Sequence, residues 1–115
     1  MPRMSIAAAA KRADAAVVFA ALGDETRLRI VARLCEEGPL SIIHLAAGAT
    51  VSRQAITKHL HALEAAGLAR GSRAGRESVW ELRPDRLADV QRYLDQISQD
   101  WDAALGRLRA FVESD

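Results

Sequence analysis

Residues 51–68, which read VSRQAITKHLHALEAAGL, are the stretch that best indicates the fold. Ser52 can cap a helix, and Gly67 lies where a left-handed residue commonly ends one. Between them, apolar side chains recur at helical spacing on one face, at Ile56, Leu60 and Leu63. This pattern predicts an amphipathic helix with one face in a core and the other face free to bind.

Upstream of this stretch the pattern is also helical. Ser41 can cap a short helix that Gly48 closes, and residues 49–51 then make a tight turn. Residues 14–22 and 24–37 predict two earlier helices, with Asp24 as the cap of the second and Gly38-Pro39 at its end. Gly23 suits a left-handed cap between the two.

Downstream of this stretch the pattern changes to strands. Residues 68–72 and 78–82 read as two short strands, and residues 73–77 form a loop of hairpin length with Gly75 at its centre. Pro84 then fits the first turn of a last helix, over about residues 84–113.

The predicted fold is mainly α with a small β-hairpin, in the order α-α-α-α-β-β-α of a winged helix-turn-helix. Residues 1–12 lack a clear period and are expected to form a flexible N-terminal arm, and residues 13–115 form one domain. The short helix and the helix that Ser52 caps and Gly67 ends form the helix-turn-helix, and the hairpin forms the wing.

In a helix-turn-helix, the N-terminal residues of the second helix reach base edges in the major groove. Arg and Gln can make paired hydrogen bonds to guanine and adenine, whereas Ser and Thr suit phosphates. Two arginines of the predicted hairpin suit the DNA backbone or the minor groove. The predicted DNA-binding residues are therefore Ser52, Arg53, Gln54, Thr57, Lys58, His61, Arg73 and Arg76.

Together these residues resemble the ArsR/SmtB family of winged helix-turn-helix transcriptional regulators. Residues 22–30, LGDETRLRI, resemble the family's entry helix, residues 51–60 with 63–68 its recognition helix, and residues 73–76 its wing. The last helix resembles that of non-metal members. The resemblance implies a homodimer, paired through its first and last helices, that represses transcription and releases DNA when an inducer arrives.

The last helix carries an apolar stripe too long for the core of a small domain. Its members recur at intervals of three or four residues over about 26 residues, so a second helix is expected along it. The predicted dimer interface comprises Val18, Leu22, Leu87, Val90, Leu94, Ile97, Trp101, Leu105 and Leu108. Tyr93 and Trp101 suit interface anchors, with a small-molecule pocket at the seam as the alternative.

The sequence predicts no metal site and no cofactor. The short helix lacks the paired cysteines of the metal-sensing members, and the last helix has no histidine. The three histidines are His44, His59 and His61, and His59 is expected to bond locally. Cys35 is the sole cysteine, which fits a reducing cytoplasm, and it is expected to be buried and inert rather than a redox sensor.

Charge distribution favours a polyanionic partner for the middle of the chain. Residues 51–84 carry six basic against three acidic side chains, and residues 85–115 carry four against seven. No enzyme motif and no membrane segment is found in the sequence. The basic charge and the helix-turn-helix pattern together make a double-stranded DNA operator the expected partner. An unidentified small-molecule or protein inducer is expected as well. The alternatives are a protein-interaction module on the same scaffold and a ligand- or redox-sensing regulator.

Overall fold

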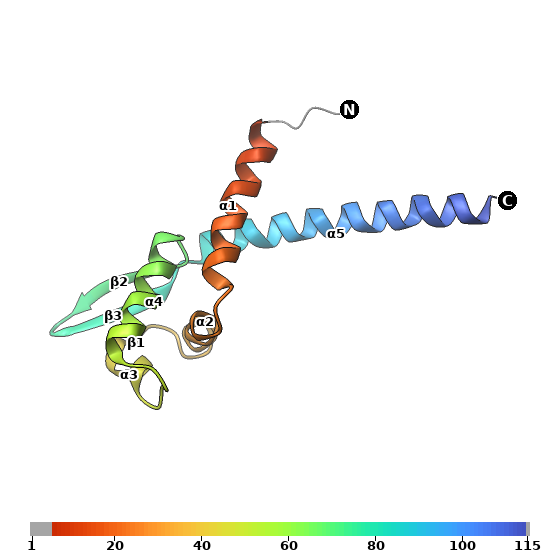
Figure 1. The fold of residues 1–115 in the computed structure, drawn as a ribbon. Coiled ribbons are helices and arrows are strands. Elements are labelled where there is room, and N and C mark those ends of the chain that lie inside the picture. Colours follow the sequence, from red (N-terminus) through yellow and green to blue (C-terminus); the bar gives the residue numbers. More distant parts are fainter. Residues whose placement is uncertain (1–5, 115) are drawn as a thin grey trace.

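The structure is a computed structural model that describes residues 6–114. A small helical domain carries a three-stranded sheet, and two helices project from it (Figure 1). The elements in chain order are α1 (Ile6–Leu22), α2 (Glu25–Glu37), β1 (Leu40–Ser41), α3 (Ile42–Ala46), α4 (Arg53–Ala65), β2 (Ala69–Ala74), β3 (Glu77–Leu82) and α5 (Pro84–Glu113).

The helix-turn-helix forms as predicted, with both of its caps. The Ser41 Oγ accepts a hydrogen bond from the His44 amide at 3.2 Å, and the Ser52 Oγ accepts one from the Ala55 amide at 3.1 Å. Each bond satisfies an amide that has no partner within its own helix. The two serines therefore fix where α3 and α4 begin.

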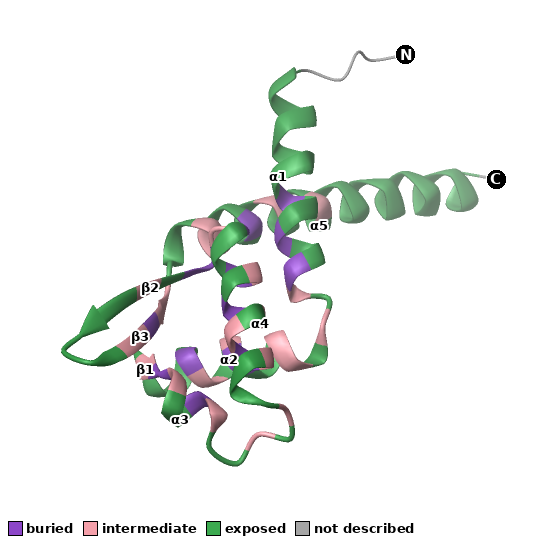
Figure 2. Cartoon of the chain, turned by 60° about the vertical axis from the view of Figure 1, so that its left-hand side comes forward, coloured by how far each residue is buried: buried purple, intermediate pink, exposed green. Residues whose placement is uncertain are grey.

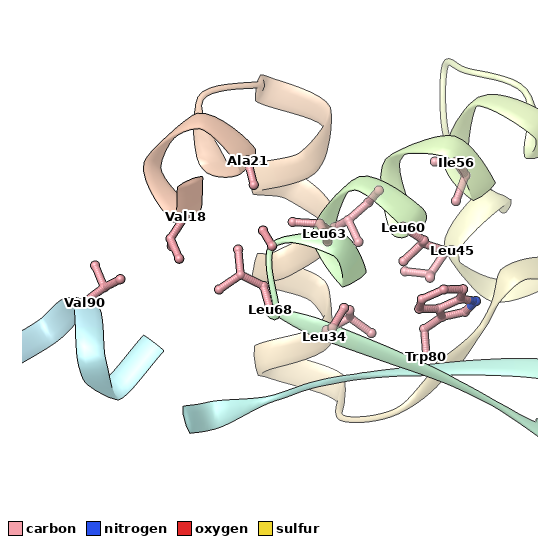
Figure 3. Close-up of a cluster of buried hydrophobic side chains, with 13 residues drawn as sticks. Val18, Ala21, Leu34, Leu45, Ile56, Leu60, Leu63, Leu68, Trp80 and Val90 are labelled. Carbon is pink, nitrogen blue, oxygen red and sulfur yellow. The ribbon is translucent and has the colours of Figure 1, made fainter. Parts of the chain in front are cut away.

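The core gathers around the inner face of α4. Leu60 and Leu63 are fully buried, and Ile56 and Leu68 are nearly so. Figure 3 shows these side chains in one cluster with Trp80 of β3. The buried face of α4 is the face that the apolar spacing predicted.

The sheet has one strand more than predicted, in the order β1-β3-β2. β1 has two residues, and its pairing of Leu40 with Trp80 joins segments 40 residues apart, which a local pattern does not indicate. The hairpin turn is also tighter than the expected loop at 73–77. β2 and β3 stay paired up to Ala74 and Glu77, because Gly75 has φ +64° at the first position of a two-residue turn.

α1 begins earlier than the sequence suggested. Residues 6–12, expected to belong to a flexible arm, form its first turns, since the alanine run there has the highest intrinsic helix propensity. Residues 1–5 of that arm lie outside the described residues. Gly23 does not take the left-handed conformation predicted for it, whereas Gly38, Gly48 and Gly67 have positive φ. The amide of Gly23 bonds instead to the carbonyl of Ala20, at 3.3 Å, within a bend.

α5 covers the domain with its first turns only. Val90 packs near Val18 of α1, while every residue from 98 to 114 is exposed, so the outer half of α5 projects beyond the domain (Figure 2). Val18 and Val90, predicted at the dimer interface, belong to the core of the single chain, and Leu22 and Leu87 are half-buried against that core. The spacing of apolar residues in the sequence indicates which face of α5 is buried, but it does not indicate that α1 of the same chain covers the first part of that face.

Cys35 is exposed, contrary to the buried position expected for it. It lies on α2 away from the stripe that buries Ile30 and Leu34. Within residues 6–114, no helix is long and apolar enough to cross a membrane.

Candidate nucleic-acid interface

The first turn of α4 presents uncompensated polar side chains to solvent. Arg53, Gln54 and Lys58 are exposed, and neither cation has an ion-pair partner among the described residues. Ser52 is exposed beside them, and its oxygen caps the helix. Because the first amides of a helix lack intrahelical partners, this end also offers backbone donors to an anion.

Thr57 differs from these neighbours. It is half-buried, and its Oγ1 donates a hydrogen bond to the carbonyl of Arg53 at 2.9 Å. The hydroxyl proton is therefore used within the helix, and only the oxygen lone pairs remain for an outside donor. This geometry makes Thr57 a poorer phosphate donor than the sequence suggested.

The wing contains two kinds of arginine. Arg70 is paired with Glu81 across the strands, with 2.5 Å between Nη2 and Oε1, and this contact raises the pKa of Arg70 above its ordinary value. Arg73 and Arg76 lie nearer the turn, both exposed, with no acidic partner among residues 6–114. The turn end of the wing therefore has uncompensated positive charge.

The three histidines make separate local contacts. His59 accepts a hydrogen bond from Arg27 at its Nδ1, 3.2 Å away, and lies 4.0 Å from the Asp24 carboxylate. The Nδ1 of His44 is 2.9 Å from the Ser41 hydroxyl. Within residues 6–114, no group of three or more His, Cys, Asp or Glu side chains is arranged to hold a metal ion.

Arg27 of α2 connects three helices, because it contacts both α1 and α4. Its Nε donates to the carbonyl of Ala21 at the end of α1, while its Nη1 reaches His59 on α4. Its own amide donates to the Asp24 carboxylate at 3.0 Å, which lowers the pKa of Asp24. The arrangement fixes α4 against the start of α2.

His61 lies apart from the other predicted DNA-binding residues. Its side chain is 63% exposed, but its ring meets the Trp80 ring edge-on, with 5.5 Å between centroids. Glu64, which the sequence did not single out, lies 3.5 Å from its Nδ1. The i,i+3 spacing of His61 and Glu64 in the sequence indicates that their side chains can meet on one face of the helix. Their proximity to the wing depends on tertiary packing, which the sequence pattern does not show.

The helix-turn-helix with a β-hairpin wing defines the class of protein, and comparison with known proteins supports this. A helix-turn-helix domain model matches residues 22–71. The chain is similar to the HTH-type transcriptional regulator Rv2034 of Mycobacterium tuberculosis, with 38% identity over 95 residues, 83% of this chain and 85% of the relative.

Two solved structures are similar over almost the whole chain. An ArsR-like transcriptional regulator from Rhodococcus sp. RHA1 has 40% identity and a TM-score of 0.80, over 92% of this chain and 99% of that one. A homodimeric winged helix-turn-helix DNA-binding domain from Mycobacterium bovis has 24% identity and a TM-score of 0.65, over 93% and 95%. The chain belongs to the ArsR-like family of winged helix-turn-helix transcriptional regulators.

Proposed function

We propose that this regulator is a cytoplasmic homodimer that binds a specific double-stranded DNA operator and represses transcription until an unidentified signal releases it. The observation that carries the proposal is the uncompensated polar surface at the start of α4, accompanied by Arg73 and Arg76 on the wing. These cations lack acidic partners among the described residues, whereas Arg70 on the same wing is paired with Glu81. Phosphates are the natural counter-charge for such a surface.

Homodimerisation is supported by the unpartnered stripe on the outer half of α5. Trp101 is 66% exposed, and Leu105, Leu108 and Val112 are exposed on the same helical face. The radius of gyration is 19.1 Å, against about 13 Å for a compact domain of this length. A second copy covering the stripe from Leu94 outward would bury this surface, as the homodimeric domain of Mycobacterium bovis has a partner copy.

The proposal is tested by measuring duplex binding across a salt series. Fragments of the source genome that the protein retains are selected and sequenced first, which supplies the operator. The wild-type protein is expected to bind this operator more tightly than a scrambled duplex, with affinity falling steeply as salt rises. Binding with no preference and no salt dependence would favour the protein-interaction module instead.

The wing variants refine this experiment. Arg73→Ala and Arg76→Ala are expected to weaken binding to both duplexes about equally. Each should lower the salt slope by about one for every phosphate that a half-site no longer neutralises, hence by about two in a dimer. The double variant Arg70→Ala with Glu81→Ala is the matched control, because it removes a paired cation and anion, leaves the net charge of the wing unchanged and should change the slope less.

A further inference from the structure

The last turn of α4 contacts the base of the wing through a carboxylate. The Glu64 Oε2 accepts a hydrogen bond from the amide of Gly71 on β2 at 3.4 Å, and its Oε1 is 3.5 Å from the His61 Nδ1. The His61 ring in turn meets the ring of Trp80 on β3, at an interplanar angle of 86°. One turn of the recognition helix thus contacts both strands of the wing.

Gly71 lies where the ring of Trp80 leaves no room for a side chain. β2 is an edge strand, so an amide that points away from β3 has no partner in the sheet. Gly71 lies opposite Trp80 in the strand register, and a Cβ on it would come within 2.9 Å of the Trp80 ring. Trp80 is only 5% exposed within the core, so its ring cannot move aside easily.

We propose that Glu64 is a positioning residue, which with His61 and Gly71 holds the wing at a fixed angle to the recognition helix. This inference rests on the proposed DNA-binding function. Arg73 and Arg76 follow Gly71 by two and five residues, and a strand advances about 3.3 Å per residue. A small tilt of β2 at Gly71 is therefore enlarged toward the turn, and the two arginines would leave the phosphates.

The direction in which duplex affinity changes when Glu64 is removed distinguishes a positioning residue from an ordinary surface acid. A carboxylate close to DNA repels phosphate, so removing an uninvolved glutamate should leave binding unchanged or tighten it. Removing Glu64 should weaken binding by roughly three- to tenfold, as expected for losing one exposed hydrogen bond of ordinary net strength. Glu64 is 45% exposed, so the variant is expected to fold.

The experiment compares Glu64→Ala with Glu64→Gln, whose amide oxygen can still accept from Gly71, and with Glu77→Ala, which removes an acid from the same wing. Duplex affinity is measured across salt for each variant, alone and combined with Arg76→Ala. We expect Glu64→Ala alone to weaken duplex binding. We also expect Arg76→Ala to reduce the affinity less in the Glu64→Ala protein than in the wild type, because the two residues are coupled. Glu64→Gln should bind almost as the wild type does.

A second measurement needs no DNA. Hydrogen exchange of the Gly71 amide, followed by NMR, should be faster in Glu64→Ala than in wild type and Glu77→Ala. If Glu64→Ala fails to fold, His61→Ala provides the same comparison through the Trp80 contact. An unchanged exchange rate of the Gly71 amide in Glu64→Ala would overturn the positioning role. Tighter duplex binding by Glu64→Ala, together with the same loss of affinity on Arg76→Ala as in the wild type, would overturn it as well. A wild type without salt-dependent binding would instead overturn the proposed function, while the exchange result would still report on the contact.

Discussion

Gln54 is the side chain at the start of α4 best suited to reading a base. It is exposed, carries no charge, and has a donor and an acceptor that match an adenine edge. We expect Gln54→Ala to cost about 1–3 kcal/mol at the cognate operator and to relax preference at one base position. Binding of wild type and variant to single-base operator variants measures this.

Arg53 is expected to behave like Gln54, whereas the wing arginines should not discriminate between sequences. Because Arg53 is charged and lies beside the helix N-terminus, its alanine variant should also lower the salt slope if it holds phosphate. The opposite outcome, in which the wing variants lose only cognate binding and Gln54→Ala weakens all duplexes equally, would contradict the assigned roles.

Asp24 makes the stability of the fold depend on acid pH. Its carboxylate accepts the Arg27 amide and lies near His59, and these contacts hold its pKa below the ordinary 3.8. The charged form is therefore favoured in the folded state, and the resulting stability is present above the unfolded pKa. It is lost as the pH falls through that value toward the lower pKa of the folded state.

The test replaces Asp24 with Asn, which also caps helices well but does not titrate. Asp24→Asn should be somewhat less stable than wild type at neutral pH, because it lacks the stabilising charge, and should lose less stability than wild type between about pH 5 and pH 3. Urea unfolding at several pH values measures this. Glu36→Gln, at an exposed position of the same helix, is the control. An identical acid dependence in wild type and Asp24→Asn would show that the contact is not responsible.

At the scale of the elements, Gly67 controls the transition from α4 to the wing. Its φ is +79°, its amide bonds the carbonyl of Glu64, and the Leu68 amide bonds that of Leu63. A Cβ there would also come within 2.9 Å of the Arg86 side chain. Gly67→Ala is expected to destabilise the protein by about 1–2 kcal/mol, the cost of a left-handed residue with a side chain.

Gly106→Ala is the matched control for this substitution. Gly106 lies within α5, its φ is not positive, and an added Cβ would meet nothing within 4 Å. Alanine should therefore stabilise this helix by about 0.5–1 kcal/mol, the opposite sign to Gly67→Ala. Thermal unfolding of both variants gives the comparison, and a loss of stability in Gly106→Ala would indicate that this position packs against another surface.

The elements that the sequence predicted are those set by local signals. Ser41, Ser52 and the buried spacing of α4 are encoded within a few residues, so both helices of the helix-turn-helix were predicted with their caps. β1 was not predicted, since it exists through pairing with Trp80 and Val79 far along the chain. The predicted DNA-binding residues lie on α4 and the wing, as their positions in the sequence indicated, but the contact between Glu64 and Gly71 depends on how α4 packs against the sheet.

At the scale of the whole molecule, basic charge and exposed apolar surface lie on different parts of the chain. The basic excess of residues 51–84 lies on α4 and the wing, and the acidic excess of residues 85–115 lies mostly on α5. DNA would repel an acidic α5, which is consistent with the proposed use of its apolar stripe as the dimer interface. α5 has 30 residues and is therefore about 45 Å long.

The outer half of α5 permits a test of dimerisation that leaves the folded domain intact. Leu105 is 53% exposed and lies on the same helical face as Leu94, Trp101 and Leu108. Leu105→Glu would place a charge in an apolar seam, where burying it without a partner is costly. We expect wild type to sediment as a dimer at micromolar concentration and Leu105→Glu as a folded monomer with weaker operator binding. Ala103→Glu adds the same side chain on the opposite face of α5 and should remain dimeric. A monomeric wild type would contradict the proposed homodimer. A dimeric Leu105→Glu would show that the dimer interface does not lie on the apolar stripe of α5.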